Sequence, residues 1–252
     1  MASHPASTGI LTAIDAPASM APGSLARLGG VMYLVTIATG LFRELYVKGR
    51  IVVPGDVAAT AAKLDRLEFL WRTGIAAELV MVLCGVVLTW VLYLLLAPTD
   101  ARLALLMALF SLAALAVESA CAVLLVQALF PISASSMQMV DPVVRHALVG
   151  MTLRSHEYGF GIALLMFGPF FLIAGTLIRR SRLFPKVVGG LYQVAGAGYL
   201  IHSFALVLVP SVAGTVFILV APAIFIGEAT FCLWLLFKGI DEEVWSRREV
   251  TP

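Results

Sequence analysis

The sequence predicts an all-α fold, a polytopic transmembrane bundle of six spans with a short interfacial helix between spans 1 and 2. Of its 252 residues, 61% are hydrophobic and only 13% are charged, whereas charged residues make up about 25% of a soluble domain. The mean hydropathy is +0.99. The apolar residues also fall into six runs, each near the ~20 residues that a helix needs to cross a bilayer.

The chain divides into a tail, a membrane domain and a second tail. Residues 1–24 contain Pro, Ala, Ser and Gly but no Lys or Arg. They therefore lack the basic start of a secretory signal, and their composition predicts a disordered N-terminal tail. Residues 25–240 form the predicted six-span domain, and residues 241–252 form a short charged tail.

The first span is predicted over residues 25–47, and the interfacial helix follows it. Pro54 and Gly55 break regular structure, and Asp56 can cap a helix that starts after it. Residues 57–67 are rich in alanine and carry three charges, which indicates a short helix at the membrane surface.

The second and third spans are followed by a polar segment. The second span is predicted over residues 68–97, and the third over residues 103–129 with Pro131 as its end. Residues 131–150 are too polar and too few to span, so we expect a loop with one interfacial turn at residues 142–148.

Three further spans complete the predicted bundle. The fourth covers residues 151–178, the fifth residues 187–209 and the sixth residues 213–237. Pro169 and Pro222 lie inside the fourth and sixth spans, where each predicts a kink. Small residues recur every seven positions in the fifth span, which predicts close helix packing there; they are Gly189, Gly196 and Ser203.

An even number of spans places both termini on one side of the membrane. The 17 Lys and Arg residues divide almost equally between the two sides, so the positive-inside rule gives little bias. A dense basic segment between the fourth and fifth spans favours cytoplasmic termini, namely Arg179, Arg180, Arg182 and Lys186. The basic residues of the first loop would then face outward.

Ionisable side chains within the spans are the strongest functional candidates, because each costs about 2.5–3.5 kcal/mol on insertion scales. Glu78, Glu118 and Glu228 occupy the second, third and sixth spans. Arg72 can pair with Glu68 at i,i+4, which leaves Glu78 to find a partner on another helix.

The candidate site combines these carboxyls with polar residues of other spans. Glu78 and His156 are the hypothetical catalytic pair. The candidate ligand-binding residues are Arg43, Glu44, Arg50, Arg72, Glu118, Tyr158, Tyr199, His202 and Glu228. We expect them to line one cavity that opens away from the termini. The structural alternative is that the carboxyls form interhelical hydrogen bonds and the histidines serve packing.

Several classes of site are excluded. The sequence contains no GxSxG, HExxH, P-loop or Asp-rich diphosphate motif. Its three cysteines form no CxxC or Cys/His cluster, so we expect no metal and no cofactor. A net charge of +2 without a basic, aromatic-rich run argues against nucleic acid. The expected partners are membrane lipids, and the oligomeric state is left open.

Three features follow one another along the chain: the VPGD turn after Arg50, the Arg72 and Glu78 pair, and the His156-x-Tyr158-Gly159 motif. Their order resembles an uncharacterised bacterial family of multi-pass membrane proteins, catalogued only as a domain of unknown function. The likeness covers about residues 25–240, and these three features are its most specific parts. The resemblance implies a multi-pass bacterial membrane protein and supplies no activity. We expect the inner membrane as its location.

Three functions remain open from the sequence. The first is binding or conduction of a small amphipathic or lipid-like molecule in an intramembrane polar cavity. The second is an intramembrane enzyme for a lipid or isoprenoid, in which a carboxyl kept from water acts as acid or base. The third is proton-coupled transport through the intramembrane carboxyls.

Overall fold

The computed structural model describes residues 20–249, and every regular element there is a helix, which confirms the predicted all-α class. The elements are α1 (Pro22–Leu41), the π-helix η1 (Phe42–Lys48), α2 (Gly49–Ile51), α3 (Val57–Arg66), α4 (Glu68–Leu96), α5 (Ala101–Gln127), α6 (Phe130–Ser133), the 3-10 helix η2 (Ser135–Met137), α7 (Pro142–Ser181), α8 (Lys186–Leu208), α9 (Pro210–Phe237) and α10 (Glu242–Glu249).

Six of these helical segments are long and apolar enough to cross a membrane. The first joins α1, η1 and α2 into 30 residues, and the third joins α5 and α6 into 33 residues. The others are α4, α7, α8 and α9. The chain is therefore a multi-pass integral membrane protein. Of the N-terminal tail predicted over residues 1–24, residues 1–19 lie outside the described part of the chain.

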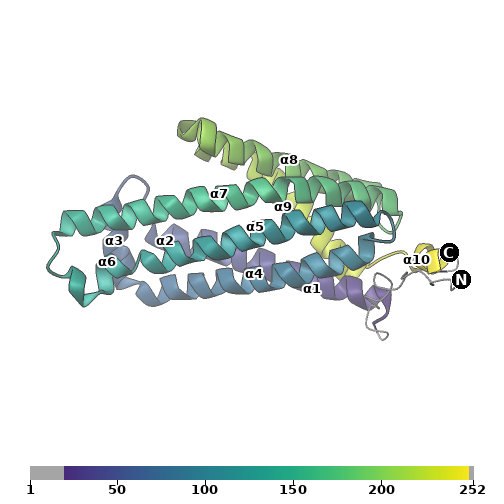
Figure 1. The fold of residues 1–252 in the computed structure, drawn as a ribbon, viewed down its shortest axis with the longest axis horizontal. Helices are drawn as coiled ribbons and strands as arrows, with labels where there is room; N and C mark the ends of the chain where they lie inside the picture. Colours follow the sequence, from purple (N-terminus) through teal and green to yellow (C-terminus); the bar gives the residue numbers. More distant parts are fainter. Residues whose placement is uncertain (1–19, 250–252) are drawn as a thin grey trace, which may run out of the picture.

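The six spans form a ring in which each packs against the next in the sequence. α1 contacts α4, α4 contacts α5, α5 contacts α7, α7 contacts α8 and α8 contacts α9, and α9 then closes the ring against α1. Figure 1 shows α4, α5 and α7 running side by side for most of the length, with α8 leaning away from them. The short helices α3 and α6 lie at the end opposite α10.

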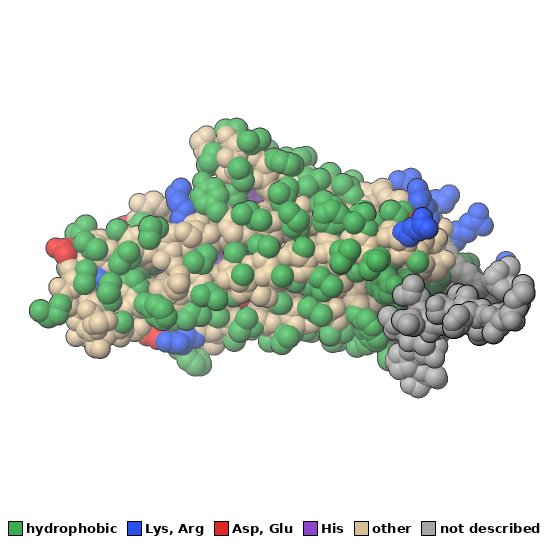
Figure 2. Space-filling model, viewed as in Figure 1, with side chains coloured by type: hydrophobic (Ala, Val, Ile, Leu, Met, Phe, Trp, Pro, Cys, Tyr) green, Lys and Arg blue, Asp and Glu red, His purple; other side chains and the backbone are tan. Residues whose placement is uncertain are grey.

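The sides of the bundle are apolar, as expected for a surface that faces lipid. Hydrophobic side chains cover the middle of the face in Figure 2, while Lys and Arg side chains lie toward its ends. Large exposed residues such as Phe69, 80% exposed, and Leu45, 70% exposed, would be unfavourable in water. A bilayer removes that penalty.

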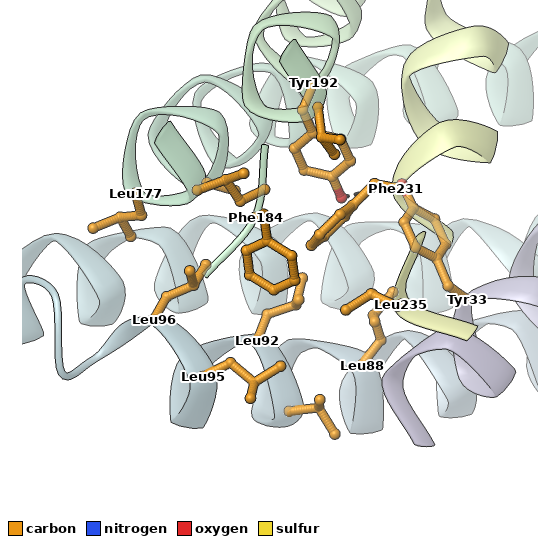
Figure 3. Close-up of a cluster of buried hydrophobic side chains, with 14 of the residues drawn as sticks. Tyr33, Leu88, Leu92, Leu95, Leu96, Leu177, Phe184, Tyr192, Phe231 and Leu235 are labelled. Carbon is orange, nitrogen blue, oxygen red and sulfur yellow. Dashed lines mark hydrogen bonds between the residues drawn. The ribbon is translucent and has the colours of Figure 1, made fainter. Parts of the chain in front are cut away.

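An aromatic core fills the half of the bundle near the described termini. Tyr192 and Phe231 are fully buried, and their ring centroids lie 5.0 Å apart. The Tyr33 hydroxyl donates to the Tyr192 hydroxyl at 3.0 Å. Figure 3 shows these rings meeting leucines of α4 and α7 around Phe184. This core joins α1, α4, α7, α8 and α9 into one unit.

A second apolar cluster closes the opposite end. It contains Ile51, Leu64 and Trp71 of the first-loop region together with Leu125 and Val149. The Trp71 Nε1–H donates to the Leu125 carbonyl oxygen at 2.9 Å. The interfacial helix α3 buries Thr60, Ala61 and Leu64 on one face and is held against α4, α6 and α7.

The predicted loop over residues 131–150 is wrong in its second half, because α7 already begins at Pro142. Asp141 caps this helix by accepting from the Val143 N–H at 2.7 Å, and proline at the first helical position is favourable. The early turns are also anchored, since Val149 is fully buried. The polar composition of this segment led to the prediction of a loop, whereas the structure has a capped helix that packs against α3.

Other boundaries moved by a few residues, and each shift has a local cause. The first span continues past residue 47 to Ile51 through η1. Pro131 lies in the first turn of α6 rather than ending a helix, and Pro210 begins α9. α7 and α9 continue through Pro169 and Pro222, so neither proline ends a span.

The small residues of α8 allow the close packing that their spacing predicts. A Cβ atom on Gly189 would lie 2.6 Å from the Gly175 oxygen, and one on Gly196 would lie 2.8 Å from the Gly168 oxygen. Ser203 is buried as well. The backbones of α7 and α8 therefore touch along this line, which confirms the predicted interface and fixes the position of α7.

Candidate functional site

Glu78 lies at the centre of a buried ionic cluster formed by three segments. Its Oε2 atom accepts from Arg43 Nη1 at 3.2 Å, and its Oε1 atom lies 3.5 Å from His156 Nε2. Glu78 belongs to α4, Arg43 to η1 and His156 to α7. Glu78 therefore has two partners on other segments, where the sequence predicted at least one.

The π-helix η1 carries Arg43 into the bundle. Single π-turns are common at functional sites, because they change which side chains face inward. The flanking residues Phe42 and Leu45 are exposed, whereas Arg43 and Val47 are buried. The segment therefore turns one cation toward the interior while leaving apolar residues toward lipid.

An aromatic ring completes the cluster on α7. The Arg43 guanidinium carbon lies 4.9 Å from the centroid of the Phe160 ring. The His156 ring is nearly parallel to the same ring, with an interplanar angle of 10° and centroids 6.2 Å apart. Because 156 and 160 are one helical turn apart, Phe160 supports both partners of Glu78. Nothing in the sequence singled this phenylalanine out.

Two polar atoms next to this cluster lack hydrogen-bond partners. Arg43 Nε and Glu118 Oε1 are buried and have no partner among the described residues. Glu118, on α5, lies close enough to interact electrostatically with both Glu78 and Arg43. A buried polar atom without a partner is unfavourable by about 1–3 kcal/mol. The cluster thus retains an unused donor and an unused acceptor.

The cluster is closed around its carboxylate and reaches the protein surface at two side chains. The Glu78 side chain is 0% exposed, while those of Arg43 and His156 are 11% and 10% exposed. These exposed edges belong to helices that span the membrane. A molecule that reached Glu78 would have to pass Arg43 or His156.

The cavity expected around these residues stays a prediction. Two depressions of the described surface border neither Glu78 nor His156. One is lined by Arg50, Lys63, Arg66 and Leu67, and the other lies around the loop after α7 and the end of α9. The predicted members Glu78, His156, Arg43 and Glu118 nevertheless converge.

Tyr199 and Glu228 form a second polar pair, away from the first. The Tyr199 hydroxyl donates to Glu228 Oε1 in a short hydrogen bond. Glu228 also lies near the Tyr33 and Tyr192 hydroxyls in the aromatic core. The sequence did not identify Tyr33 or Tyr192 as neighbours of Glu228, because tyrosines of membrane proteins are mainly expected as interfacial anchors.

The remaining candidates lie apart from Glu78. Glu44 pairs with Lys48 at 2.6 Å, and Arg72 pairs with Glu68 at 2.7 Å, as its spacing predicts. These pairs are exposed, and such pairs contribute little to stability. The Arg50 guanidinium carbon lies 4.1 Å from the Tyr46 ring centroid.

His202 and Tyr158 also have other surroundings. The His202 ring packs against Phe217 of α9 with centroids 4.9 Å apart. Tyr158 is half-buried and makes no hydrogen bond to Glu78 in the described part of the chain. Within residues 20–249, no group of three or more His, Cys, Asp or Glu side chains could hold a metal ion.

One comparison with known proteins gives a match. The family model with the description "Domain of unknown function (DUF4386)" matches residues 28–239, which include five spans in full and the first span from residue 28 onward. No curated protein and no solved structure matches the chain. The match agrees with the resemblance found in the motifs and covers all residues of the ionic cluster.

Proposed function

The chain belongs to the family described as Domain of unknown function (DUF4386), and we propose that it binds a small amphipathic molecule at the Arg43–Glu78–His156 cluster. The observation that carries this proposal is the pair of buried, unpartnered atoms Arg43 Nε and Glu118 Oε1. A head group that both accepts and donates a hydrogen bond, such as a hydroxyl, would satisfy them.

The energetics favour a functional role for the cluster over a structural one. Replacing a buried ion pair by apolar residues of similar volume is often neutral or stabilising. Ionisable groups within membrane spans accordingly mark substrate or ion sites. The apolar flanks of the bundle complement the proposal, because the exposed edges of Arg43 and His156 would receive a molecule arriving from the bilayer.

We expect the purified protein to carry its ligand. Mass spectrometry of an organic extract should reveal a small amphipathic molecule with wild-type protein, at least tenfold less with Glu118→Leu, and wild-type amounts with Glu68→Gln. Glu118→Leu removes the unused acceptor and leaves the Arg43–Glu78 ion pair intact, so its fold should persist. The control changes a partly exposed carboxyl at the start of α4. Equal amounts from all three proteins would refute the proposal.

A specific observation also favours acid–base chemistry as a second function. The imidazole of His156 next to the Glu78 carboxylate resembles the base-and-orienting-group arrangement used for proton transfer. The two functions predict different lipid contents in a bacterial strain that carries Glu78→Gln. A lipid or isoprenoid that accumulates there, and is consumed in the wild-type strain, indicates catalysis. Unchanged lipids indicate binding alone.

We also propose a bacterial inner-membrane location with cytoplasmic termini. Arg179, Arg180, Arg182 and Lys186 surround the loop after α7, and dense cations resist translocation. This loop lies at the same end as α10, because the Asp241 N–H donates to the Leu183 oxygen at 3.2 Å.

A cysteine-labelling experiment tests this orientation. Ser181 is a poor labelling site because it is fully buried, so Arg180→Cys, at an exposed position, is preferable in a chain whose native cysteines are replaced by alanine. In intact cells it should resist a membrane-impermeant thiol reagent, whereas Ser136→Cys at the opposite end should react. The reverse pattern would invert the orientation.

A further inference from the structure

A depression with three basic side chains lies at the end of the bundle opposite α10. It has a volume of about 260 Å³ and is lined by Arg50, Lys63, Arg66 and Leu67. Arg50 comes from α2, at the end of the first span, and Lys63 and Arg66 come from α3. The three cations therefore converge from two helices that are separated in the sequence by a turn.

None of these three cations takes part in a salt bridge of the described residues, whereas most acids of this end are already engaged. Glu44 pairs with Lys48, and Glu68 pairs with Arg72. Asp56 caps α3 by accepting from the Ala59 N–H at 2.8 Å. The depression thus has an excess of positive charge that no carboxylate neutralises.

Asp65 is the remaining acid of α3. It lies two residues after Lys63 and one before Arg66, and side chains at these spacings do not face each other on a helix. It therefore leaves the charge at the depression largely unbalanced. Arg50 is further positioned by the Tyr46 ring, 4.1 Å from its guanidinium carbon, which keeps its hydrogen-bond donors available.

The walls of the depression are firmly held. The Val53 N–H donates to Thr60 Oγ1 at 2.9 Å, and the Thr60 hydroxyl donates to the Asp56 oxygen at 2.8 Å. Ile51 and Leu64 are both fully buried in the apolar cluster of this end. The turn between α2 and α3 is therefore locked, and the cations are held near one another before any anion arrives.

Exposed apolar side chains near the cations in the sequence favour a lipid as the occupant. Leu45 is 70% exposed and Phe69 is 80% exposed, and both flank the segments that carry Arg50, Lys63 and Arg66. Such side chains belong in the acyl-chain region, and Tyr46 is typical of the membrane interface. The cations therefore stand at the level of lipid head groups, where basic clusters attract anionic lipids.

We infer that the depression lined by Arg50, Lys63 and Arg66 binds the phosphate of an anionic phospholipid, whose acyl chains lie along Leu45 and Phe69. Arginine and lysine donors match phosphate oxygens. The site is separate from the Glu78 cluster, because it lies at the end of the bundle and none of its lining residues contacts Glu78. It would hold the interfacial helix α3 to the bilayer.

Native mass spectrometry with added dioleoylphosphatidylglycerol tests this inference on the full chain in a neutral detergent. We expect Lys63→Gln/Arg66→Gln to weaken binding of this lipid at least tenfold. The matched control, Lys48→Gln/Arg72→Gln, removes two cations from the same end that are already paired with glutamates, and should change binding less than twofold. All four positions are exposed, so both variants should fold.

Two outcomes would overturn the inference. Equal weakening by the two double variants would show a general charge effect with no specific site. In the second outcome, inorganic phosphate at 10 mM displaces the lipid from the wild-type protein and has no such effect on Lys63→Gln/Arg66→Gln. That result would identify a site for a free anion and not for a lipid. Retention of the lipid in phosphate, with the predicted difference between variants, supports it.

Discussion

Replacing Glu78 by leucine is expected to lower the free energy of unfolding by about 3–5 kcal/mol, because it leaves the buried Arg43 charge without its partner. The Arg43 side chain is 11% exposed and hydrogen-bonds to Glu78 at 3.2 Å. His156 would lose the same carboxylate. Reversible unfolding by SDS in mixed micelles, followed by tryptophan fluorescence, measures the change.

A double variant separates this effect from simple loss of packing. Arg43→Met/Glu78→Leu removes both charges, so we expect its stability to return to within about 1 kcal/mol of wild type, since apolar replacement of an entire buried pair is often neutral. A double variant as unstable as Glu78→Leu would mean that the ion pair itself holds the bundle together. The cluster would then have a structural explanation.

Replacing Gly189 by leucine is expected to destabilise the bundle by about 3 kcal/mol, the upper part of the usual range for overpacking. A Cβ atom at Gly189 would lie 2.6 Å from the Gly175 oxygen and 3.1 Å from the Arg179 nitrogen. Both are backbone atoms, which cannot move aside as the end of a side chain can. The helices α7 and α8 would have to separate.

The adjacent glycine is the matched control. A Cβ atom at Gly190 would meet no atom within 4 Å, so Gly190→Leu should change stability by less than about 0.5 kcal/mol, as expected for a substitution that disturbs no packing. The two variants have the same composition and the same helix propensity. Equal stabilities would show that α7 and α8 are not packed backbone to backbone.

The hydropathy of the sequence predicted all six spans, because the bilayer imposes one length on each apolar run. It did not predict where the helices end within polar segments. The start of α7 depends on the Asp141 cap and on burial of Val149, and both involve tertiary contacts. The continuation of the first span to Ile51 depends on the π-helical turn η1, which hydropathy does not mark.

Four of the candidate residues come together, namely Arg43, Glu78, Glu118 and His156, but how they pair could not be predicted from the sequence. The insertion cost of a carboxylate showed that Glu78 needs a partner on another helix. Which partner it finds depends on the rotation of each helix, and the π-helix turns Arg43 inward by an amount that residue spacing does not reveal. For the same reason, Phe160 was missed, while Tyr199 and Glu228 pair with each other in a different place.

The most direct test of the proposed binding site is the amount of amphipathic ligand that co-purifies with Arg43→Met/Glu78→Leu. This variant should keep its fold while losing the charges that would hold a polar head group. We predict wild-type resistance to unfolding together with at least a tenfold loss of the ligand recovered from wild-type protein. A stable double variant that retains the ligand at the wild-type ratio would contradict the assignment of the site to this cluster.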